Sequence, residues 1–70
     1  MSIKILTAKD NPKVAELKNE FDIFRVIDIK KGKLEMIEFF NKDGAFRGFG
    51  RDTKTAFKKA TKTLKNYYTK

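Results

Sequence analysis

Two glycine-containing turns constrain this chain most, because they divide its middle into three short runs rich in β-forming residues. The first turn is Lys31-Gly32-Lys33 and the second is Asn41-Lys42-Asp43-Gly44. A glycine supplies the positive φ that a tight hairpin needs, and Asp-Gly is a strong hairpin signal. The runs around the turns are therefore expected to pair as antiparallel strands: Phe21–Lys30, Lys33–Phe40 and a shorter Ala45–Phe49.

The segment before these strands predicts a short helix. Asn11 can cap it, and Pro12 suits the first helical position, where a missing N–H costs nothing. We expect this helix over Pro12–Glu20. The preceding Ser2–Thr7 run contains β-branched residues and predicts either a short first strand or an ordered N-terminal arm.

The C-terminal segment predicts a longer amphipathic helix, capped by Asp52 or Thr53. Its apolar positions fall within about 120° of arc, the width of a stripe that faces a core. They are Ala56, Phe57, Ala60, Leu64, Tyr67 and Tyr68. We interpret the tyrosines as core residues in preference to a platform for stacking.

These elements indicate an α+β fold in one domain, residues 1–70. A three-stranded antiparallel sheet packs on the C-terminal helix, accompanied by the N-terminal helix and the alternative extra strand. Apolar residues occur on both faces of the strands, with Ile23, Ile27 and Ile29 on one and Val26 on the other. Either both faces are covered or one keeps apolar groups for a partner. Coverage by the N-terminal segment is the favoured explanation.

Positive charge is concentrated after position 40. The chain carries 17 Lys and Arg against nine Asp and Glu, a net charge of +8. Nine of the cations but only two of the acids, Asp43 and Asp52, lie in the last thirty residues. A structural helix face usually mixes signs for i,i+4 pairing, and this one does not. The asymmetry favours a polyanionic partner.

Gly48 and Gly50 flank the point where a strand is expected to become a helix. A glycine before a helix N-terminus can favour phosphate binding, but Asp52 would compete for the same site. The third glycine of a dinucleotide fingerprint is absent, since position 53 is Thr. We therefore interpret the two glycines as a corner that lets the chain approach the sheet closely.

The run GAFRGFGRDTKTAFKKATKTLKNYY, together with the order of strands and turns before it, resembles the arm-type DNA-binding domains of phage lambda-like integrases. The resemblance covers about Phe21 to Tyr68. It implies a three-stranded sheet packed on a C-terminal helix and inserted into the major groove. An additional helix precedes the sheet here and no recombinase domain follows, so the resemblance implies a free-standing relative from a phage or mobile element.

The chain also resembles, more weakly, the double-stranded-RNA-binding domain. That domain likewise ends in a basic helix after its sheet, and its helix begins with a lysine-rich stretch. Lys54, Lys58 and Lys59 match that stretch in part.

The absence of histidine and cysteine removes most routes to catalysis and the usual transition-metal ligands. Paired carboxylates could be drawn from Asp22, Asp28, Glu35 and Glu38, but charged positions on strand faces explain them better. We expect no enzyme and no cofactor. No run approaches the ~20 apolar residues of a membrane span. A soluble, cytoplasmic protein that does not bind membrane is expected.

We expect a small protein that binds nucleic acid, with duplex DNA favoured. Lysines and arginines of the last helix and the strand before it would neutralise phosphates, and Arg47 is the best candidate for a base contact. Turn lysines would meet the groove or its rim, with Arg25 and Lys30 beside them. The predicted site residues are Arg47, Arg51, Lys54, Lys58, Lys62, Lys65, Lys31, Lys33 and Lys42.

The alternative is a protein interaction module, such as a phage-encoded inhibitor of a host nucleic-acid enzyme. Its partner would present an acidic surface. In that case aromatic and apolar side chains on an uncovered sheet face would carry the binding energy. The candidates are Phe24, Val26, Phe39 and Phe49.

Overall fold

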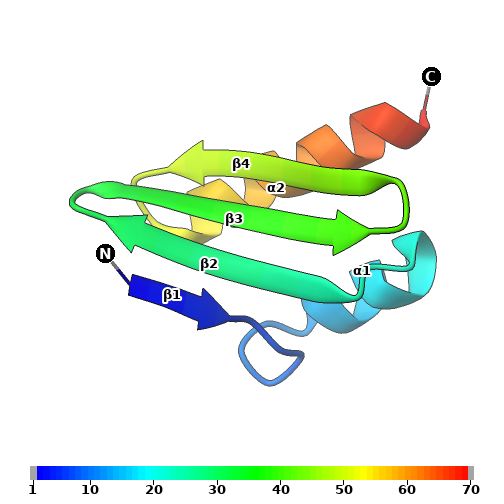
Figure 1. Ribbon diagram of the computed structural model, residues 1–70, viewed down its shortest axis with the longest axis horizontal. Coiled ribbons are helices and arrows are strands. Elements are labelled where there is room, and N and C mark those ends of the chain that lie inside the picture. Colours follow the sequence, from blue (N-terminus) through cyan, green and yellow to red (C-terminus); the bar gives the residue numbers. More distant parts are fainter. Residues whose placement is uncertain (1, 70) are drawn as a thin grey trace.

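The computed structural model describes residues 2–69 as a four-stranded antiparallel sheet with two helices (Figure 1). The sheet order follows the chain, β1-β2-β3-β4. The elements are β1 (Ser2–Ile5), α1 (Lys13–Phe21), β2 (Arg25–Lys31), β3 (Leu34–Asn41), β4 (Gly44–Gly50) and α2 (Thr53–Tyr68). The α+β class and the meander after the first helix are as predicted.

The first segment is a strand, which decides between the two alternatives that the sequence left open. Ile3 pairs with Ile29 and Ile5 with Ile27, so β1 extends the sheet beside β2. The sheet therefore has four strands, where a core of three was expected. The last strand, β4, is also longer than predicted and equals β2 in length.

The first helix forms one residue later than the expected Pro12–Glu20, because α1 spans Lys13–Phe21 and Pro12 is its N-cap. The side chain of Asn11 accepts a hydrogen bond from the backbone N–H of Lys13 at 3.0 Å, which satisfies one of the free donors of the first turn. The C-cap that follows the helix is Asp22, which adopts the left-handed conformation with φ 58°. Phe21, expected in a strand, is the last residue of the helix.

Both helices cover the same face of the sheet. Strand alternation turns Val26, Ile37 and Phe39 toward the helices, and all three are fully buried. Figure 1 shows α1 and α2 behind the sheet, with nothing in front of it. The core on the covered side comprises Leu6, Val14, Leu17, Ile23, Val26, Ile37, Phe39, Phe46, Ala56, Phe57, Ala60 and Leu64.

Two expectations about the faces are therefore wrong. The N-terminal segment does not cover the second face, because α1 packs beside α2 on the first. Ile23 does not share the face of Ile27 and Ile29; it is buried in the core, since the left-handed Asp22 changes the chain direction just before β2.

The first turns of α2 lie very close to β4, which confirms the close approach expected at Gly48 and Gly50; both glycines belong to β4, however, and the corner follows at Arg51 and Asp52. A Cβ atom at Gly48 would lie 2.5 Å from the carbonyl oxygen of Ala56 and still closer to the backbone nitrogen of Ala60. A Cβ atom at Gly50 would lie 2.8 Å from the backbone nitrogen of Ala56. The helix can rest on this strand only where side chains are absent.

The interpretation of the tyrosines as core residues is wrong, because Tyr67 and Tyr68 are 47% and 40% exposed and lie outside the buried cluster. Tyr68 still helps to hold the sheet. The Tyr68 ring stacks on Phe21 with centroids 5.3 Å apart. Its hydroxyl donates to Asp43 Oδ2 at 2.5 Å and accepts from Asn41 Nδ2 at 2.8 Å. Asn41 also donates to the carbonyl of Phe21 at 2.9 Å. These contacts join α1, the β3–β4 turn and the last turn of α2.

Candidate nucleic-acid interface

Basic side chains from three separate parts of the chain meet around the start of α2. A shallow hollow at the β2–β3 turn is lined by the basic Lys30, Lys33 and Arg51, by the acidic Glu35 and Asp52, and by Thr53. Thr53 also lines a groove between α1 and α2, so the two hollows adjoin. The groove adds four further cations. The basic strip, as we define it, comprises Lys13, Lys30, Lys33, Arg51, Lys54, Lys58 and Lys65.

The cations of the basic strip are exposed and unpaired. Among residues 2–69, ion pairs join Lys4 to Asp10 and Arg47 to Glu38, and none involves a member of the strip. A lysine outside an ion pair keeps most of its attraction for a phosphate, although the charge of Asp28 acts on Lys30 and that of Asp52 on Lys54. The strip is therefore available to a polyanion.

The groove between the helices has a volume of about 650 Å³ and a mixed lining. Leu17 and Phe57 form its apolar part, while Glu16 and Glu20 on α1 bring negative charge to one side. The cations of α2 lie on the other side. Most cations of the strip therefore lie along α2 and at the β2–β3 turn, across the groove from Glu16 and Glu20.

The N-terminus of α2 is already capped. The side chain of Asp52 accepts a hydrogen bond from the backbone N–H of Thr55 at 2.7 Å, as the sequence predicted. This bond, with a smaller contribution from Lys54, holds the pKa of Asp52 below its usual value. A carboxylate thus occupies the position where a phosphate would otherwise bind, so the strip must act through its side chains.

Five predicted residues belong to the strip and four do not. Arg51, Lys54, Lys58, Lys65 and Lys33 are brought together there. Lys42 lies in the β3–β4 turn, at the opposite end of these strands. Alternation places Lys31 and Arg47 on the uncovered sheet face, and Lys62 lines neither hollow.

Arg47, the predicted base contact, is engaged by its neighbour. Its Nε donates to Glu38 Oε2 at 2.7 Å, directly across the β3–β4 pair. Its side chain remains 60% exposed, whereas that of Glu38 is 9% exposed. A base contact by Arg47 would have to compete with this ion pair, and the residue points away from the strip.

Lys13 is the member of the strip that sequence reasoning missed. It begins α1, far along the chain from the basic C-terminal segment. Nothing in its local sequence distinguishes it from other surface lysines, because its proximity to α2 arises only when both helices pack on the same face.

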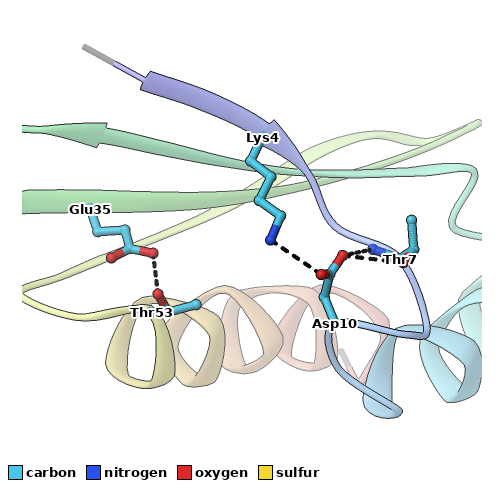
Figure 2. A network of polar contacts seen from close by, with 5 residues as sticks. All are labelled: Lys4, Thr7, Asp10, Glu35 and Thr53. Atoms are coloured by element: carbon cyan, nitrogen blue, oxygen red, sulfur yellow. Dashed lines mark hydrogen bonds and ion pairs between the residues drawn. The ribbon is translucent and has the colours of Figure 1, made fainter.

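A buried carboxyl pair lies beside the strip. Asp28 and Glu35 occupy neighbouring strands on the helix side, and both are buried. The Thr53 hydroxyl donates to Glu35 Oε2 at 2.6 Å (Figure 2). Oδ1 of Asp28 has no hydrogen-bond partner. Burial, followed by the interaction with Glu35, raises the pKa of Asp28 to about 6, against the opposing charges of Lys30 and Lys4.

Asp28→Asn is expected to stabilise the protein at neutral pH. A raised folded-state pKa means that Asp28 favours folding when protonated, below pH ~4, and that this contribution disappears as the pH rises through about 6. The amide avoids a buried charge, so the variant should gain on the order of 1–3 kcal/mol at pH 7 and much less at pH 4. Urea titrations at both pH values measure this difference; an equal effect at both would contradict the protonation assignment.

A polar cluster of another kind holds the loop before α1. Figure 2 shows Lys4 reaching Asp10, with 3.2 Å between Nζ and Oδ1. The backbone N–H of Thr7 donates to Asp10 Oδ2 at 2.9 Å, and its hydroxyl donates to the same oxygen at 3.1 Å. These bonds close a turn at the surface and leave Lys4 unavailable to the strip.

Comparisons with known proteins found no matching family model, no matching curated protein and no matching solved structure. The candidate function therefore rests on the geometry of the chain itself. Across residues 2–69, no cluster of three or more potential metal-ligating side chains occurs. Neither helix of that range is long and apolar enough to span a membrane.

Proposed function

We propose that this protein binds a nucleic-acid duplex by contacting its phosphates with the basic strip. The observation that carries the proposal is the convergence of unpaired cations from α1, the β2–β3 turn and the start of α2. Phosphate contacts dominate the affinity of nucleic-acid binding and orient the protein on the duplex. Apart from Arg51, the members of the strip are lysines, which suit phosphate contacts, so recognition of shape and charge fits best.

The position of the strip shifts the proposal from duplex DNA toward duplex RNA. An arm-type domain uses the face of its sheet, but here that face is largely apolar and its Arg47 is paired with Glu38. The double-stranded-RNA-binding domain resembles this chain in the basic helix that follows the sheet. Duplex RNA is read mainly by shape and by contacts to phosphates and 2′-hydroxyls, which suits lysines on a helix and a nearby turn.

A salt titration tests the proposal. With a 20-base-pair RNA duplex, four to six phosphate contacts should make log K fall with log [KCl] with a slope of roughly −3 to −5. A DNA duplex of the same sequence and the single RNA strand serve as comparisons. Tighter binding of RNA duplex than of the other two is expected. No binding at low salt, or affinity that does not change with salt, would refute the function.

A second candidate is an acidic protein segment bound in the groove between α1 and α2. The groove favours this reading because Leu17 and Phe57 lie beside the lysines of α2, which suits an amphipathic helix with one acidic edge. Val26 and Phe39, proposed from the sequence as contacts with a protein, are fully buried and cannot serve. Phe24 and Phe49 remain exposed. Competition between duplex RNA and an acidic helical peptide for the strip would support a shared surface.

A further inference from the structure

The uncovered face of the sheet carries a continuous apolar surface. The register aligns Ile3, Ile29, Met36 and Phe49 in one row across all four strands. Ile5 and Ile27 continue the surface in the next row. We call the side chains on this side the open face. Ile3 and Ile5 are each 61% exposed and Phe49 is 47% exposed, so the row is accessible to solvent.

Scattered exposed apolar residues are normal in a monomer, but a contiguous set is not. On an antiparallel sheet with one solvated face, alternation should place polar residues outward. Here isoleucines occupy successive outward positions of β1 and β2. The open face therefore has the composition of a covered surface.

The open face carries three cations, Arg25, Lys31 and Arg47, against one acid, Glu38, so it holds +2 of the chain's net charge of +8. Near its centre, Arg47 and Glu38 neutralise each other across β3 and β4. Arg25 and Lys31 lie at the two ends of β2, away from the centre. The basic strip lies around the helices and the β2–β3 turn. Two copies of this basic protein could thus meet through their open faces with little repulsion at the centre of contact.

The size of the open face is also suitable for a stable interface between two copies of the chain. The Cα atoms span 33 × 26 × 18 Å, and Figure 1, viewed along the shortest axis, looks directly onto the sheet. The open face is thus on a broad side of the molecule. A standard stable interface buries about 800 Å² on each partner, which is of the same order as this side.

We propose that the open face is the interface of a symmetric dimer of this chain. The two sheets would pack face to face, about 10 Å apart, as in a β-sandwich. A two-fold axis makes such a contact self-complementary. The basic strips of the two copies would remain outside the interface, so the dimer could engage two segments of duplex.

Sedimentation and light scattering of the full chain at about 1–300 µM test the proposal, since mass action controls dimer formation. Dimers are expected at the upper concentrations. Met36→Lys should weaken dimerisation by roughly 100-fold, because it places a charge at the centre of the apolar contact. Met36 lies in an internal strand, so this change does not affect the free sheet edges. A dimer that survives Met36→Lys would contradict face-to-face packing.

Two further variants complete the experiment. Phe49→Lys changes a more exposed member of the same row and should give the same loss if Met36→Lys fails to fold. Phe24→Lys is the matched control, because Phe24 is 65% exposed but lies in the segment between α1 and β2. It should leave the dimer intact. A wild-type chain that is monomeric throughout would overturn the proposal and assign the open face to a different partner.

This experiment is independent of duplex binding. Charge changes in the basic strip should abolish RNA binding and leave the oligomeric state unchanged. Met36→Lys should abolish the dimer and leave the binding of RNA to each individual strip unchanged. Failure of dimerisation therefore leaves the proposed function intact, and failure of RNA binding leaves the dimer intact.

Discussion

Replacing Gly48 with alanine is expected to destabilise the protein by more than about 4 kcal/mol, enough to unfold much of a small domain. The added Cβ would lie 2.5 Å from the Ala56 oxygen and 2.6 Å from the carbonyl carbon of Lys59. These are backbone atoms, so no side chain can rotate away. To relieve the clash, α2 would have to move off β4 and withdraw Phe57 and Leu64 from the core.

Gly32→Ala is the matched control for this prediction. Gly32 adopts φ 61°, and a Cβ there meets nothing within 4 Å. The left-handed backbone should cost about 1–2 kcal/mol without any clash. Circular dichroism and urea denaturation of both variants measure the difference. Similar midpoints for the two would show that α2 does not depend on close approach at Gly48.

The second large effect is expected from charge reversal in the basic strip. Changing Arg51, Lys54 and Lys58 together to glutamate should lower the affinity for an RNA duplex at least ~100-fold at moderate salt. Each change removes a phosphate contact and adds a like charge that repels the backbone. The three residues lie in or next to the first turns of α2, where the strip is densest. The slope of log K against log [salt] should become shallower by about 3, because three phosphate contacts are lost.

The control must carry the same net charge. Changing Lys42, Lys59 and Lys62 to glutamate alters the total by the same amount, but none of these residues lines either hollow. This variant should lose far less affinity than the strip variant. Fluorescence anisotropy with a labelled duplex compares the two at several salt concentrations. Equal losses would mean that the overall charge, and not the strip, governs binding.

The local elements of this fold were largely predictable because each depends on residues close together in the sequence. Asp43-Gly44 and Gly32 specify their hairpins through the backbone conformations that they allow. Asp52 caps α2 through a donor three residues away. The apolar stripe of α2 followed from helical periodicity, and its first four members are buried, whereas Tyr67 and Tyr68 are exposed. Element ends were less accurate: Phe21 joined a helix, and β4 extended at both ends.

The composition of the candidate site was harder to predict, because it depends on how distant segments pack. Lysines look alike in the sequence, yet Lys33 joins Arg51 while Lys42 lies at the far end of the sheet. Arg47 was a reasonable candidate for a base contact until its cross-strand partner, Glu38, was known. The residue that faces Arg47 across the sheet depends on the register of the two strands, and a count of charges does not reveal that register.

The sequence by itself determined the order of elements from the first helix onward, the two hairpins, the cap of α2 and the excess of positive charge. These follow from backbone preferences and residue types that act over a few positions. The tertiary structure alone decided which face of the sheet is covered and which cations share one surface. Apolar residues on both faces of β2 left that choice open, and the packing of α1 beside α2 resolved it. Burial of one face thereby created both the basic strip and the exposed row of Ile3, Ile29, Met36 and Phe49.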